Sequence, residues 1–142
     1  MARIKLELPE KFLFETEMCV RITDINYGGH MGNDASLSII HEARMRFLKN
    51  YGFSEMDVGG VGIIMSDAVV CYKSESFYGD ELVIQVAVGD VSDYGCDLFY
   101  KITNKLSGKE VVRAKTGIVF FDYPSKKIAK TPAAFIQKMD LR

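Results

Sequence analysis

The pattern of hydrophobic and polar residues in the first third of the chain predicts a strand, a loop and a helix. Residues 12–22 are rich in aromatic and β-branched side chains, which favours an extended strand. A polar, glycine-rich loop is predicted over residues 23–33. From residue 35 to about residue 51, apolar side chains recur every three or four positions, which is the spacing of an α-helix. Asn33 is expected to cap this helix, and Gly52 is expected to end it.

The predicted helix has one broad apolar face. At about 100° per residue, this face carries Leu37, Ile40, His41, Arg44, Leu48 and Tyr51, with Ile39 and Phe47 on its flanks. The opposite face carries Ser38, Glu42, Arg46 and Lys49. We therefore expect a core helix that meets a sheet over more than half of its circumference, with His41 as a hydrogen-bonded core histidine.

Four strand-like segments follow the helix. They cover residues 61–74, 82–92, 96–104 and 111–122, and the turn signals between them have hairpin lengths. Sequential antiparallel pairing is therefore expected. Pro124 is expected to end the last strand, and Pro132 to open a short helix through Met139. The predicted architecture is α+β, with one helix against one sheet.

Composition narrows the class of protein. A chain of 142 residues and 16.0 kDa predicts a single domain over residues 1–142. The net charge of −1 leaves no electrostatic footprint for nucleic acid, and no apolar run is long enough to span a membrane. The three cysteines stand far apart in apolar stretches, which is typical of inert thiols in a reducing compartment. We expect a cytoplasmic protein.

Several chemistries lack their usual residues. The two histidines are eleven positions apart without a cysteine pair, so no metal site is expected. The glycine pairs lack the lysine or the further glycines of a phosphate-binding loop. No serine lies in a Gly-x-Ser-x-Gly turn.

The densest group of reactive side chains lies around the glycine-rich loop. The segment reads Arg21-Ile-Thr-Asp24-Ile-Asn26-Tyr-Gly-Gly29-His30-Met-Gly32-Asn33, and Glu42-Ala43-Arg44 follows in the helix. A strand, then Arg-x-x-Asp-x-Asp-x-x-Gly-His-x-x-Asn, then a helix with Glu-Ala-Arg, resembles the hotdog-fold acyl-CoA thioesterases of the 4-hydroxybenzoyl-CoA thioesterase-like group. The resemblance extends from about residue 17 to residue 132.

This resemblance implies a fold, an assembly and a reaction. The hotdog fold is a curved antiparallel sheet of about five strands wrapped around a long central helix. The family implies a homodimer that joins two sheets, with a dimer of dimers (a homotetramer) as the alternative. The site would lie at the subunit interface and hydrolyse an acyl-CoA thioester. CoA is then part of the substrate, and no separate cofactor is implied.

One departure from the motif leaves two hypotheses open. The second Asp of the family, its usual nucleophile or general base, is Asn26 here, and an amide cannot take a proton from water. In the first hypothesis, a hydrolase, Asn26 positions a water and a nearby group accepts its proton. The candidate acceptors are His30, Asp24 and Glu42. The oxyanion would be held at the helix start, by the N–H groups of Gly32, Asn33 and Asp34. The second hypothesis is a non-catalytic acyl-thioester binding module.

Structural roles compete for the same residues. Arg44 lies on the apolar face and needs a carboxylate if it is buried, for which Asp24 and Asp67 are the candidates. Glu42 has Arg46 four positions on, the spacing of an exposed ion pair. Asn26 also suits a turn. Three strand cations, Lys73, Arg113 and Lys115, either face CoA phosphates or belong to a solvated sheet face.

Overall fold

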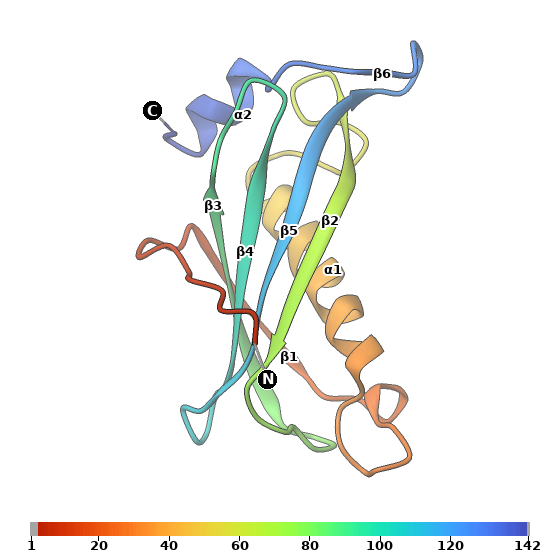
Figure 1. Ribbon diagram of the computed structural model, residues 1–142, viewed down its shortest axis with the longest axis vertical. Coiled ribbons are helices and arrows are strands. Elements are labelled where there is room, and N and C mark those ends of the chain that lie inside the picture. The colour runs from red at the N-terminus through yellow and green to blue at the C-terminus, as the bar shows by residue number, and fades with distance from the viewer. Residues whose placement is uncertain (1–2, 142) are drawn as a thin grey trace.

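A six-stranded antiparallel sheet lies against one long helix in the computed structural model, which describes residues 3–141 (Figure 1). Met1, Ala2 and Arg142 of the predicted domain lie outside the described residues. The strands are β1 (Phe14–Cys19), β2 (Gly62–Tyr72), β3 (Glu81–Gly89), β4 (Gly95–Asn104), β5 (Glu110–Asp122) and β6 (Lys127–Ile128). The helices are η1 (Ile22–Asp24), a single turn of 3-10 helix, the long α1 (Asn33–Asn50) and the short α2 (Ala133–Lys138). The predicted α+β architecture is confirmed.

The strand order is β1-β3-β4-β5-β2, with the short β6 paired to β5. Sequential pairing is confirmed for β3, β4 and β5. The predicted hairpin between residues 61–74 and 82–92 is wrong, because β2 pairs with β5 at the far edge of the sheet and β1 takes the place beside β3. The strand predicted over residues 12–22 is shorter than expected, and β6 was not expected.

The segment between β2 and β3 explains this order. Residues 73–80 do not form a hairpin turn but cross the end of the sheet. At their start, the N–H of Lys73 donates to the carbonyl oxygen of Val111 in β5 (2.8 Å). At their end, Gly79 donates to Val20, just after β1 (2.9 Å). The crossing therefore carries the chain from one edge of the sheet to the other.

The buried face of α1 differs from the predicted one. Its buried residues are Ala35, Ser36, Ile39, Ile40, Ala43, Arg44, Phe47 and Leu48. Ala43 is small and fully buried, so the helix approaches the sheet along the line through it. Leu37 and His41 lie outside this stripe and are exposed, so the prediction of a core histidine is wrong. The core that the helix closes includes Phe47, Tyr100 and Phe120.

The start of α1 also differs from the prediction. The N-cap is Gly32, in extended conformation and without a side-chain cap, and Asn33 is the first helical residue. A β-carbon at Gly32 would stand 2.7 Å from Oδ1 of Asp34, so the missing side chain leaves room for that carboxylate. At the other end Gly52 has a φ of +83°, which agrees with its predicted role as the stop signal.

The three cysteines are unpaired, as predicted, but they are not all core residues. Cys96 is buried, and burial, with a smaller contribution from Asp97, raises the pKa of its thiol to about 12. Cys19 is exposed and Cys71 is half-buried, so the prediction of an inert core thiol holds only for Cys96. No helix within residues 3–141 is both long and apolar enough to cross a bilayer.

Candidate functional site

Two loops meet at the N-terminus of α1. One leads into the helix and contains Asn26 and His30, and the other is the crossing segment after β2. Met31 donates its N–H to the carbonyl oxygen of Ser76 (2.7 Å), which joins the two loops, and Figure 1 shows them together at one end of the molecule. A cavity of about 250 Å³ between them is lined by His30, Met31 and Asn33 on one side and by Tyr72, Lys73, Ser74 and Glu75 on the other.

Asn26 forms the base of a tight turn. Its N–H donates to the carbonyl oxygen of His30 (2.9 Å), and its own carbonyl oxygen accepts from Gly29 (3.1 Å). Its side-chain Oδ1 accepts the N–H of Gly28 (2.9 Å). The turn requires a φ of +82° at Gly29, a conformation that glycine adopts without strain. The predicted turn role of Asn26 is therefore real, and the turn also fixes where its amide lies.

The His30 ring is half-buried and faces the same side of this turn. Its Nδ1 lies 3.3 Å from the carbonyl oxygen of Met31. A neutral imidazole that donates from Nδ1 leaves Nε2 as a hydrogen-bond acceptor. Nε2 lies 3.3 Å, and Oδ1 of Asn26 lies 3.2 Å, from the point where a β-carbon on Gly28 would stand. The two acceptor atoms thus converge on the space beside Gly28 that a side chain would fill in any other residue.

The helix start beside His30 supplies hydrogen-bond donors. The first N–H groups of an α-helix have no partner within the helix and carry the positive end of its dipole. In α1 these groups belong to Asn33 and Asp34, whose side chains are exposed. The N–H of Gly32 already donates to the carbonyl oxygen of Asp24 (2.9 Å). The free donors therefore begin at Asn33.

The other two candidate acids, Asp24 and Glu42, lie elsewhere. Both line a different cavity, of about 420 Å³, between β1 and α1. Asp24 is only 4% exposed, and its Oδ2 accepts the backbone N–H of Arg21 (2.8 Å). Asp24 is the last residue of η1, where the backbone is helical and not extended. The expectation that an extended backbone would point the side chains of Asp24 and Asn26 the same way is therefore wrong. Glu42 forms the predicted ion pair with Arg46 (2.9 Å).

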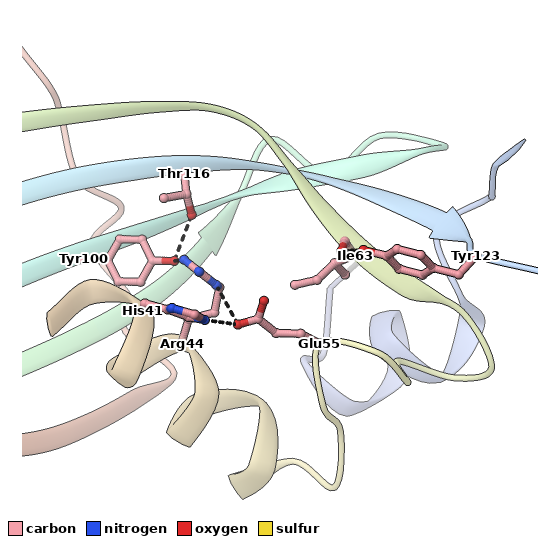
Figure 2. A network of polar contacts seen from close by, with 7 residues as sticks. All are labelled: His41, Arg44, Glu55, Ile63, Tyr100, Thr116 and Tyr123. Carbon is pink, nitrogen blue, oxygen red and sulfur yellow. Dashed lines mark hydrogen bonds and ion pairs between the residues drawn. The ribbon is translucent and has the colours of Figure 1, made fainter. Parts of the chain in front are cut away.

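Arg44 is buried, with 6% of its surface exposed, but neither predicted partner reaches it. Its Nε lies 3.5 Å from Oε1 of Glu55, in the loop after α1, and its Nη1 donates to the Tyr100 hydroxyl (3.3 Å) (Figure 2). His41, on the same helix, shares the Glu55 oxygen (2.8 Å). Burial raises the pKa of Tyr100, whose hydroxyl is also 2.8 Å from Oγ1 of Thr116.

The partners predicted for Arg44 have ion pairs of their own. Asp24 pairs with Arg21 (3.3 Å), and Asp67 pairs with Lys115 (3.0 Å). The Glu55 network lies beside the second half of α1, away from the His30 cavity.

Two of the three strand cations are already paired. Arg113 forms a bidentate contact with Glu110 (2.6 and 2.8 Å), which lowers the pKa of that carboxyl, and Lys115 is held by Asp67. Lys73 is the only one of the three that lines the His30 cavity. Among the described residues no group of three or more His, Cys, Asp or Glu is placed to hold a metal ion.

The sequence did not indicate Glu75 or Ser76 as neighbours of His30. Glu75 places Oε1 3.8 Å from Nε2 of His30, and the backbone of Ser76 anchors Met31. Nothing in the local pattern could have identified them, because a hairpin turn was expected between the predicted strands 61–74 and 82–92. The contact arises only because this segment crosses the end of the sheet.

Comparisons with known proteins place this chain in a family. The family model described as the thioesterase-like superfamily matches residues 20–139. No curated protein matches the sequence.

Solved structures match over most of the chain. One is a 1,4-dihydroxy-2-naphthoyl-CoA thioesterase from Synechocystis, with 22% identity, a TM-score of 0.81, and 90% of this chain and 96% of that chain covered. A probable thioesterase from Escherichia coli has 21% identity and a TM-score of 0.78, with 89% and 96% covered. A Staphylococcus aureus protein solved in complex with CoA has 17% identity and a TM-score of 0.81, with 96% and 86% covered.

These structures share the hotdog fold, which confirms the fold expected from the resemblance. The family match itself spans both loops of the site and the whole of α1, since it runs from Val20 to Met139. This hotdog protein therefore belongs to the thioesterase-like superfamily.

Proposed function

We propose that this protein is an acyl-CoA thioester hydrolase that releases free CoA and a carboxylic acid. The observation that carries the proposal is the convergence of Asn26 Oδ1 and His30 Nε2 beside Gly28, next to the start of α1. Two acceptors on one side of a turn suit a water molecule, which has two hydrogens to donate. The family match and the solved CoA complex of a similar protein support a CoA thioester as the substrate class.

The reaction needs a base, a water and an oxyanion site. His30 Nε2 takes one proton from a water whose other hydrogen is bound by Asn26 Oδ1, and the water oxygen attacks the thioester carbonyl carbon. The N–H groups of Asn33 and Asp34 stabilise the resulting oxyanion. When the tetrahedral intermediate collapses, the C–S bond breaks and the imidazolium returns the proton to the CoA thiolate. Asn26 thus orients the water without serving as a base.

His30 is a better base candidate than either Asp24 or Glu42. Asp24 is committed to the backbone N–H and side chain of Arg21, and Glu42 is committed to Arg46. Both line the cavity on the β1 side of α1, whereas His30 and Asn33 line the other one. A base in the cavity on the β1 side of α1 would be separated from the Asn33 and Asp34 N–H groups that are proposed to stabilise the oxyanion.

The experiment is thiol release from a panel of short-chain, medium-chain, long-chain and aromatic acyl-CoAs. Wild type is expected to release thiol above the rate without enzyme, because His30 replaces the missing Asp. Asn26→Asp restores the usual family carboxylate at the same position and is run beside it. A silent wild type together with an active Asn26→Asp would contradict the proposal.

That outcome would favour the alternative, a non-catalytic acyl-thioester binding module. The observation behind this alternative is the amide at position 26, which binds a water or a carbonyl group but accepts no proton from it. Saturable binding of an acyl-CoA without its hydrolysis would identify such a module.

We further propose a homodimer joined through β2, because the two edges of the sheet differ. At the β1 edge, Arg46 Nη1 donates to the carbonyl oxygen of Glu17 (3.0 Å) and the Tyr51 hydroxyl donates to that of Leu13 (2.7 Å). Within residues 3–141, β2 ends the strand order with no strand on its outer side, and the Met65 side chain is exposed. An open edge strand of this kind favours pairing with another copy.

Antiparallel pairing of two β2 strands would place each His30 cavity, which lies at the end of β2, beside the start of the partner's β2. Sedimentation is expected to give twice the 16.0 kDa chain mass. A species of one chain would contradict the dimer, and a species of four would extend it to a dimer of dimers.

A further inference from the structure

The segment after β2 forms the second wall of the His30 cavity. With Tyr72, the last residue of β2, it contacts the first wall at three places: Tyr72 with Asn33 (3.3 Å), Ser76 with Met31 (2.7 Å), and Glu75 with His30 (3.8 Å). Among the described residues that line this cavity, Glu75 is the only acid. The carboxylate that faces His30 therefore comes from a part of the chain 45 positions away in sequence.

The backbone around Glu75 is held in place from both sides. The next residue, Ser76, is only 1% exposed, and its carbonyl oxygen accepts the N–H of Met31. The preceding residue, Ser74, donates its hydroxyl to the carbonyl oxygen of Glu110 in β5 (2.8 Å). The position of Glu75 relative to His30 is thus set by buried and hydrogen-bonded neighbours, although its own side chain is exposed.

Other charged and titratable groups also face His30. Tyr72, at the end of β2, and Lys73, directly after it, line the same cavity, and Asp34 lies in the first turn of α1. Lys73 opposes a positive charge on His30, whereas Glu75 favours it. Of these groups, Glu75 is the one whose carboxylate lies within 4 Å of a ring nitrogen, at 3.8 Å from Nε2, so the two would form an ion pair once the ring is protonated.

We propose that Glu75 is a positioning residue for the hydrolysis. Its carboxylate faces Nε2 of His30 and stabilises the imidazolium that forms when the ring takes a proton from the attacking water. This inference rests on the proposed function, because it assigns a role in the proton transfer that the proposed function gives to His30. The carboxylate does not touch the substrate and does not accept the proton.

The expected effect is modest because the contact is exposed. Two unit charges about 4 Å apart in water interact by an amount that corresponds to about a five-fold change in an equilibrium. Glu75→Gln is therefore expected to lower kcat about five-fold, with KM unchanged. Glu75→Asp keeps the charge and is expected to restore part of the rate.

Salt provides a second readout. At 1 M salt the difference in kcat between wild type and Glu75→Gln is expected to shrink, because salt screens an exposed pair of charges.

The matched control is Glu81→Gln, an exposed glutamate at the start of β3 whose nearest cation is Lys105 (3.9 Å). Glu81→Gln is expected to keep the wild-type kcat, because its carboxylate lies away from the His30 cavity. In a His30→Ala background, Glu75→Gln is expected to have no further effect on the rate.

Two kinds of failure are distinguishable. An active wild type whose kcat is the same in Glu75→Gln and in Glu81→Gln, at low and at high salt, would overturn the role of Glu75 and leave the hydrolase intact. A wild type without activity on any acyl-CoA would overturn both the proposed function and the role of Glu75 in it.

Discussion

Replacing His30 with alanine is expected to lower kcat for thiol release by at least about 100-fold while leaving the melting temperature nearly unchanged. A positioned general base contributes about 10²–10⁴-fold to such a reaction. The His30 ring contributes little to stability, since it is half-buried and its polar contacts are a 3.3 Å contact with Met31 and a 3.8 Å pair with Glu75. The measurement is steady-state thiol release together with thermal unfolding.

His41→Ala is the matched control, because it removes the only other imidazole, from an exposed position on α1. It is expected to keep kcat near the wild-type value. Equal losses of stability and rate in His30→Ala would make His30 a structural residue. An unchanged rate would remove His30 from the mechanism altogether.

Replacing Arg44 with alanine is expected to have the largest effect on stability, a loss of about 3 kcal/mol or roughly 10 °C in Tm. The change removes a buried side chain and leaves a cavity in the core. It also removes the hydrogen bond to Tyr100 and the cation beside Glu55. The measurement is chemical and thermal unfolding of the two proteins.

Arg44→Met separates charge from volume. The Nε atom of Arg44 is buried without a hydrogen bond, so the native ion pair is imperfect. An apolar side chain of similar length is therefore expected to lose less stability than alanine.

Glu55→Ala leaves the Arg44 charge without its carboxylate and is expected to destabilise the fold strongly. Unchanged melting of Arg44→Ala would contradict a structural role for this residue. Because the Glu55 network lies away from the His30 cavity, the folded fraction of these variants is expected to retain the wild-type kcat.

Local patterns predicted the elements that depend on neighbouring residues. The helix over 35–51, its stop at Gly52 and the three consecutive strands β3, β4 and β5 follow from periodicity and turn residues. The strand order did not follow, because placing β2 at the far edge depends on pairing between positions about fifty residues apart. Short connections favour hairpins, and the eight residues between β2 and β3 have a length that suits either a loop or a crossing.

The candidate site was predictable only within its own loop. Asn26, His30 and Asn33 are close in sequence, and the structure brings them to the start of α1 as expected. Asp24 was expected to join them, but η1 turns it into the other cavity. The partners that come from elsewhere, Glu75 for His30 and Glu55 for Arg44, could not be read from the sequence because both depend on how separate segments meet.

In the proposed mechanism a water activated by His30 attacks the thioester directly, without a carboxylate nucleophile. This mechanism is tested by a single turnover of an acyl-CoA with enzyme in excess in ¹⁸O-labelled water. Direct attack by water is expected to put one ¹⁸O into the acid released by the first turnover. Unlabelled acid in that turnover, with the label later found in a carboxylate of the protein such as Asp24 or Glu42, would contradict it.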